Sequence, residues 1–220
     1  MELLPNVQWN LLAAATWETI YMMLISTFFT ALFGLPLGIA LVMTEEKGLW
    51  PLPWLQRIVG FGVNLFRSIP FIVLVVWMIP VARMVVGTSL GPTAACVSLI
   101  VGAAPFYARL VETSLREVDK GVVEAARAMG ATRWQIVRKV YLPEALPGLV
   151  AGITVTCITL VSYSAITGIL GGGGLGDLAY RFGFQSFQTD VMVLATAVLV
   201  IMVQIIQSIG DRLVQAIDKR

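Results

Sequence analysis

The 220-residue sequence has no histidine, and only 13% of its residues are charged, against about 25% in soluble domains. The missing histidine excludes imidazole metal ligands, bases and proton relays. No lysine follows a glycine, so the phosphate-binding loop Gly-x-x-x-x-Gly-Lys-Ser/Thr is absent and the chain cannot hydrolyse ATP by that mechanism. We predict no catalytic residue, no metal, no cofactor and no nucleic-acid partner.

Cysteine is also scarce. The two cysteines, Cys96 and Cys157, both fall inside apolar runs. That placement argues against a disulfide framework and favours two small buried side chains.

Apolar residues, in contrast, make up 58% of the chain, and the mean hydropathy is +0.85, a value typical of multispanning membrane proteins. A bilayer core needs about 20 apolar residues in a helix, and unpaired backbone groups in lipid require helices. Five runs qualify: 19–43, 67–86, 92–111, 147–170 and 191–209. The sequence predicts an all-α membrane bundle of five spans in one domain over 1–220, with its core at about 17–212.

The positions of lysine and arginine predict the orientation. With the N-terminus outside and the C-terminus in the cytoplasm, twelve of the 15 basic residues fall on the inner side. These are Lys47, Arg57, Arg109, Arg116, Lys120, Arg127, Arg133, Arg138, Lys139, Arg212, Lys219 and Arg220. Arg83 and Arg181 fall outside, and Arg67 lies near a boundary.

Arg67 allows two arrangements. A helix over 58–79 would bury it near the middle of the bilayer, at a cost of about 2.5–3.5 kcal/mol. We favour a span that starts near Arg67, with Ser68 as its N-cap and Pro70 in its first turn, so that the guanidinium reaches the cytoplasmic interface.

The segment 112–146 is the main polar feature and is expected to form a cytoplasmic loop. Val122–Met129 has high helix propensity, and Val122, Ala125, Ala126 and Met129 would share one small apolar face. Gly130 would end this helix in a left-handed cap, and Pro143 and Pro147 would break the chain before the fourth span. Periodicity alone leaves open a solvated helix, a helix on the lipid headgroups and a docking surface.

The fourth run and the glycines after it contain the candidate transport residues. The candidate substrate path consists of Ser162, Tyr163, Ser164, Thr167 and Trp77. The alternative is that serine and threonine only join helices or bond their own backbone. The candidate external gate consists of Gly171, Gly172, Gly173, Gly174, Leu175 and Gly176, and the alternative there is a plain turn.

No acidic residue lies in the middle of a span, so an ion-coupled relay is poorly supported. The energy for transport would have to come from a partner.

The segment EAARAMGATRWQIVRKVYLP resembles the cytoplasmic signature of ABC importer permeases, Glu-Ala-Ala followed by Gly, Ile and Leu-Pro at fixed spacing. The matching residues are Glu124, Ala125, Ala126, Gly130, Leu142 and Pro143, and Val140 stands in place of the isoleucine. The resemblance implies that this helix, with Met129, sits in a groove of an ATPase subunit, by helix-in-groove recognition.

The segments NLFRSIPFIVLVVWMIP, VGAAPFYARLVE and YSAITGILGGGGLGDLAYRFGF extend the resemblance along nearly the whole chain, to the permeases of bacterial methionine ABC importers. The resemblance implies a type I ABC importer domain in the bacterial cytoplasmic (inner) membrane. It implies a homodimer in the lipid bilayer that binds two ABC ATPase subunits and a periplasmic or lipid-anchored solute-binding protein. It implies uptake of methionine, with the D-isomer included. The alternatives are a permease for glycine betaine or another small amino-acid-like solute, or a channel outside the ABC class.

Overall fold

The computed structural model describes residues 6–218, and it is helical throughout, with no strand in that part of the chain. The predicted all-α fold is confirmed. The helices are α1 (Trp9–Met43), α2 (Pro53–Ser68), α3 (Phe71–Val86), α4 (Pro92–Arg116), α5 (Lys120–Ala128), α6 (Arg133–Ile136), α7 (Leu142–Thr167), α8 (Gly174–Leu178) and α9 (Thr189–Ile217). Three π-helical turns join them: Val137–Tyr141, Gly168–Gly172 and Ala179–Gln185. Lys219 and Arg220, counted above on the inner side, lie outside the described residues.

Four helical segments are long and apolar enough to cross a membrane: Trp9–Met43, Pro92–Arg116, Arg133–Gly172 and Thr189–Ile217. A fifth crossing is formed only if α2 and α3 are taken together, and they are bent by 107° at the break between them. α1, α4, α7 and α9 extend beyond the apolar runs that predicted them, whereas α3 begins four residues after the start of its run, 67–86. The limits of the spans within the bilayer stay a prediction.

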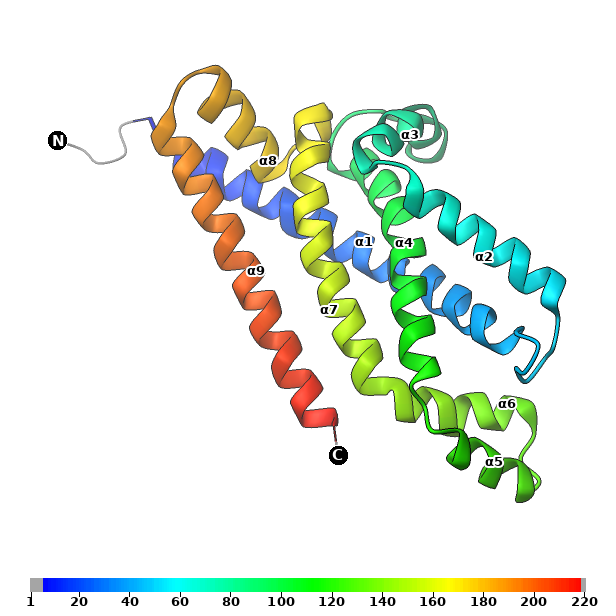
Figure 1. The fold of residues 1–220 in the computed structure, drawn as a ribbon. Coiled ribbons are helices and arrows are strands. Elements are labelled where there is room, and N and C mark those ends of the chain that lie inside the picture. The colour runs from blue at the N-terminus through cyan, green and yellow to red at the C-terminus, as the bar shows by residue number, and fades with distance from the viewer. Residues whose placement is uncertain (1–5, 219–220) are drawn as a thin grey trace.

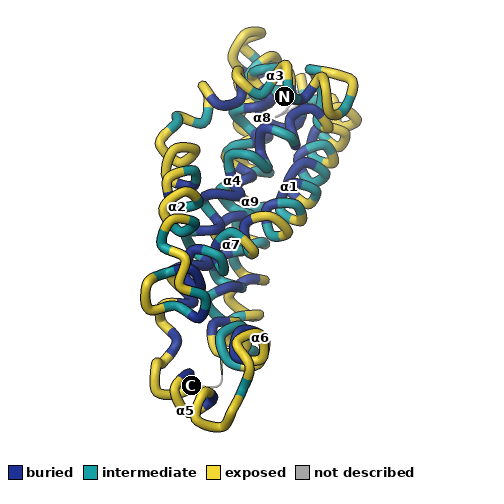
Figure 2. Tube along the Cα trace, turned by 90° about the vertical axis from the view of Figure 1, so that its right-hand side faces the viewer, coloured by how far each residue is buried: buried dark blue, intermediate teal, exposed yellow. Residues whose placement is uncertain are grey.

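The two ends of the bundle differ in what they hold (Figure 1). At one end, the α5 end, α5 and α6 lie beneath the last turns of α1 and α4 and the first turns of α7. At the opposite α8 end, α8 and the π-helical turn 179–185 pack beside the start of α1. Exposed residues gather on α2, α3 and α5, while α4 is buried along much of its length (Figure 2).

The crossing of α1 and α4 is a close contact in the core. A Cβ added at Gly38 of α1 would lie 2.5 Å from Cβ of Val111 and 2.6 Å from the carbonyl oxygen of Ala108, both on α4. Such an approach leaves no room for any side chain. The crossing therefore fixes α4 firmly against α1, and α4 leads directly into α5.

The break between α2 and α3 differs from what we expected around Arg67. Ser68 is the last residue of α2, and its hydroxyl donates to the carbonyl oxygen of Asn64 at 2.8 Å. The N-cap of α3 is Pro70, which fixes an extended backbone there and makes no side-chain cap. The expectation that Ser68 caps the second span is therefore wrong, and Arg67 lies exposed in the last turn of α2.

Candidate functional site

Local hydrogen bonds fix both ends of α5. Asp119 is the N-cap, and its carboxylate accepts from the Gly121 amide at 2.6 Å. At the other end Gly130 has a φ of +80°, and the Gly130 and Ala131 amides donate to the carbonyl oxygens of Arg127 and Ala126. This is the Schellman pattern, and the predicted left-handed cap at Gly130 is confirmed.

One side of α5 packs against the bundle. Val123 and Ala126 are buried in a cluster with Val111, Leu115 and Val137. The grouping of Ala126 with the exposed apolar face was therefore wrong, because its methyl group belongs to the core of the same chain. This packing holds α5 as a rigid extension of α4 and α7.

The other side of α5 is open. Val122, Glu124, Ala125 and Met129 are exposed, Met129 by 82%, and Glu124 makes no ion pair within the described residues. The small Ala125 side chain lets another backbone approach closely. We call this face, with Gly130, the coupling surface.

The chain after α5 does not break at the prolines as expected. Thr132 and Gln135 form a capping box that starts α6, and the helix then continues through the π-helical turn into α7. The Leu142 amide donates to the carbonyl oxygen of Val137, five residues back, so the turn is wide where Pro143 follows. A helix widened in this way accommodates a residue without an amide hydrogen. Pro143 is exposed and Leu142 half-buried, beside the coupling surface.

A charge cluster that we did not predict from the sequence lies on α4, close to the start of α5. Glu112 is 4% exposed, and its carboxylate accepts from Arg109 at 2.5 Å and from Arg116 at 2.7 Å. Arg116 also pairs with Glu45, which follows α1, and Arg109 donates to Asn64 of α2 at 2.7 Å. The spacing Arg-x-x-Glu-x-x-x-Arg was visible in the sequence, because residues three and four apart share a helix face.

The candidate path residues do not form one surface. The hydroxyls of Ser164 and Thr167 are buried and donate to carbonyl oxygens of their own helix, those of Val161 and Ser164. Tyr163 stacks on Phe71 with a ring-centroid distance of 3.8 Å, while Ser162 and Trp77 are exposed. Ser164 and Thr167 thus pack the helix, and Ser162, Tyr163 and Trp77 stay as predicted path residues.

The glycine segment is folded tightly against α1. Gly171, Gly173 and Gly174 have φ values of +92°, +79° and +81°, which side-chain-bearing residues rarely adopt. The Gly174 amide donates to Glu18 at 2.7 Å, and the Leu175 amide donates to Thr19 at 2.9 Å.

Four members of the candidate gate are therefore buried within one chain: Gly172, Gly174, Leu175 and Gly176. Leu175 is fully buried beside Ala15 and Ala195. None of the four is available to meet a second copy. The gate stays a prediction for the exposed part of the segment, at Gly171.

The bond from Leu175 to Thr19 provides a direct test of this packing. Thr19→Val keeps the shape of the side chain and leaves the buried Leu175 amide without an acceptor, so we expect a loss of about 1–3 kcal/mol in unfolding free energy. Thermal denaturation of the detergent-solubilised protein measures it. Thr16→Val is the control, because the Thr16 hydroxyl donates only to the carbonyl oxygen of Leu12 in its own helix. Equal melting temperatures for the two variants would contradict the assigned role of Thr19.

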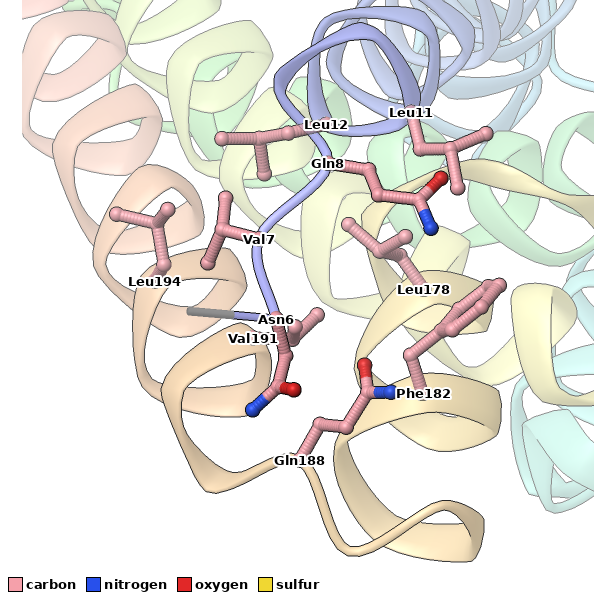
Figure 3. Close-up of a pocket in the computed structure, with 10 residues that line it drawn as sticks. All are labelled: Asn6, Val7, Gln8, Leu11, Leu12, Leu178, Phe182, Gln188, Val191 and Leu194. Atoms are coloured by element: carbon pink, nitrogen blue, oxygen red, sulfur yellow. The ribbon is translucent and has the colours of Figure 1, made fainter. Parts of the chain in front are cut away.

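The cavities differ in what they can hold. The pocket between the N-terminal segment and α9 is lined by Val7, Leu12, Leu178 and Val191, among others (Figure 3). The side-chain amide of Asn6, which also lines it, donates a hydrogen bond to Asp190. Its volume of about 10 Å³ holds at most one water molecule. A larger cavity of about 510 Å³ opens at the α8 end, lined by Glu18, Gly171, Tyr180 and Arg181 among others. Within the described residues no cluster of three potential ligands could hold a metal ion.

Comparison with known proteins identifies relatives along the whole chain. Residues 34–220 match the family described as binding-protein-dependent transport system inner membrane component. The probable D-methionine transport system permease protein MetI of Vibrio cholerae is 51% identical over 96% of this chain and 94% of its own. The methionine import system permease protein MetP of Bacillus subtilis is 50% identical over 98% of this chain and 97% of its own.

Solved structures agree with these relatives. A chain of the MetNI methionine ABC transporter, in an inward-facing conformation, is 51% identical and superposes with a TM-score of 0.95 over 98% of this chain and 99% of that chain. The predicted fold, a multispanning bundle of the type I ABC importer class, is thereby confirmed. This chain belongs to the family of binding-protein-dependent transport system inner membrane components.

Proposed function

We propose that this chain is the permease subunit of an ATP-driven importer of methionine, acting on the L-isomer and the D-isomer. The observation that carries the proposal is the similarity, at 50% and 51% identity over nearly full length, to permeases named for methionine and D-methionine transport. The similarity to the MetNI chain at a TM-score of 0.95 supports the same proposal from the structure.

The proposed assembly contains two copies of this chain, two ATPase subunits and a solute-binding protein. ATP hydrolysis takes place on the ATPase subunits, since this chain lacks a phosphate-binding loop. The coupling surface supports this arrangement, because it presents exposed Val122, Ala125 and Met129 on a helix that is rigidly joined to α4 and α7. The groove of an ATPase subunit would bury this small apolar face, with Glu124 paired to a basic group at its edge.

The proposed location is the bacterial cytoplasmic membrane, with the α5 end inside and the α8 end outside. The basic residues support this orientation, since Arg109, Arg116, Arg127, Arg133 and Lys139 all lie at the α5 end, which the positive-inside rule places in the cytoplasm.

The test is uptake in proteoliposomes that contain this chain with its ATPase subunit, ATP enclosed on the ATPase side, and the solute-binding protein outside. We expect labelled L-methionine and D-methionine to accumulate only with both ATP and the binding protein. Labelled glycine betaine is the matched control for the nearest alternative substrate. Accumulation of betaine without methionine would assign the permease to quaternary amines, and solute movement without ATP would indicate a channel.

A further inference from the structure

The charge cluster of Glu112, Arg109, Arg116, Glu45 and Asn64 is the most strongly connected polar feature that the proposed function has not used. Glu112 is at its centre, since its two carboxylate oxygens accept from the two arginines on either side of it along α4. Each arginine then reaches a different element, Arg116 to Glu45 after α1 and Arg109 to Asn64 of α2.

The charges of the cluster balance, which explains how it tolerates burial. Two carboxylates face two guanidinium groups, and the central side chain of Glu112 is only 5% exposed. A buried Glu112 carboxylate without its partners would be strongly destabilising, whereas the Arg109 and Arg116 side chains, 27% and 52% exposed, keep contact with water. The cluster therefore acts as one unit that joins the ends of three helices.

The cluster also lies on the connection through which movement of the coupling surface reaches α4. α4 ends at Arg116, and α5 begins at Lys120 after a connection whose Val118 is buried and whose Asp119 caps α5. Displacement of α5 therefore displaces the last two turns of α4, and with them both arginines. On the far side, Asn64 lies in the last turns of α2, next to the 107° bend that leads into α3.

One hydrogen-bond donor of the cluster has no partner in the part of the chain that the structure describes. The Nε of Arg109 is buried and has no hydrogen-bond partner within the described residues. Buried donors are nearly always satisfied, so a guanidinium with an unused donor at this position is suited to two alternative pairings. Two discrete arrangements are what a conformational switch between two states requires.

We propose that Glu112, with Arg109 and Arg116, is a positioning group that transmits movement of α5 to the bent pair α2–α3. The proposal rests on the proposed function, because it assigns these residues to the coupling between ATP hydrolysis and solute movement. The residues touch neither the solute nor ATP. Their task is to hold the end of α1, the last turns of α2 and the end of α4 in register with the coupling surface.

The first test replaces the central carboxylate in the assembled complex. In Glu112→Gln we expect ATP hydrolysis to continue while methionine uptake per ATP falls roughly tenfold, within the usual range of coupling between sites. Arg116→Gln should have the same effect, the double variant should be no worse than either single one, and Arg116→Lys should retain most of the coupling. Glu117→Gln is the matched control, since Glu117 is exposed and makes no ion pair among the described residues. Equal losses of hydrolysis and uptake in Glu112→Gln, or no loss of either, would overturn the proposal.

A second test needs no solute and removes only the link to α2. A fluorescent label on a cysteine at position 84 of α3, which is exposed and outside the predicted path, should change its emission when the complex binds ATP. Asn64→Ala should abolish that change while the complex stays assembled, because Asn64 is exposed and its loss opens no core. This variant decides the matter if Glu112→Gln does not fold. A label response that persists in Asn64→Ala would refute transmission through the cluster, whereas a wild-type complex that responds to ATP but moves no methionine would refute only the proposed function.

Discussion

Ala125→Trp is expected to remove the ATPase partner from the purified complex while the chain itself stays folded. Ala125 is exposed on the coupling surface, so the indole disturbs nothing within the chain. It would, however, hold the helix away from the groove that a small side chain allows it to enter. We expect association to weaken by roughly a hundredfold, the effect of a lost hot-spot contact. Co-purification of the ATPase subunit, followed by quantitative binding, measures the loss.

The matched control is Ala13→Trp, the same substitution at an exposed alanine near the start of α1, at the opposite end of the bundle. It should leave the complex intact. Full ATPase binding by Ala125→Trp would show that α5 is not the docking helix. A folding defect in Ala125→Trp alone would show that this face is already occupied.

Gly176→Ala is expected to destabilise the chain severely, although it adds one methyl group. A Cβ at Gly176 would lie 2.3 Å from Cα of Ala165 and 2.4 Å from its carbonyl oxygen. The obstacle is backbone of α7, which cannot rotate away, so either α7 or α8 would have to shift. We expect a loss of about 2–4 kcal/mol in unfolding free energy, at the upper end of the range for overpacking. Thermal unfolding followed by size-exclusion chromatography measures it.

Gly62→Ala tests the same change where no atom lies within 4 Å of the added Cβ. Gly62 lies inside α2, and alanine is the better helix former, so this variant should gain up to about 1 kcal/mol. A pair of variants with opposite signs would establish that space, and not loss of glycine as such, sets the cost at Gly176. Similar stabilities would show that α7 and α8 are packed less tightly than described.

Features that depend on neighbouring residues could be predicted from the sequence. The cap at Gly130 needs only a left-handed glycine after a helix-forming segment, and the apolar runs need only length. The all-α fold follows from the helix-forming segment and the apolar runs. α1, α4, α7 and α9 nevertheless extend past their apolar runs, because polar residues at helix ends are satisfied by caps and by water.

Features that depend on distant segments could not be predicted in the same way. The pair of Glu45 with Arg116 forms only because α1 and α4 cross at the glycines of α1. The burial of Ala126 and Leu175 depends likewise on which neighbouring helix covers them. The spacing of apolar residues predicted a helix face at 122–129. The packing of α4 and α7 determines which of its residues turn toward the bundle.

The bend between α2 and α3 has a consequence for the membrane itself. A helix interrupted at Ile69 and Pro70 has carbonyl groups at the end of α2 and amides at the start of α3 that no intrahelical partner can satisfy. Hydrocarbon cannot satisfy them either. Water therefore has to reach this point, together with the exposed Arg67 and Ser68 beside it, unless a second chain covers it. Where no second chain covers the bend, we expect the bilayer beside α2 to thin or to admit water.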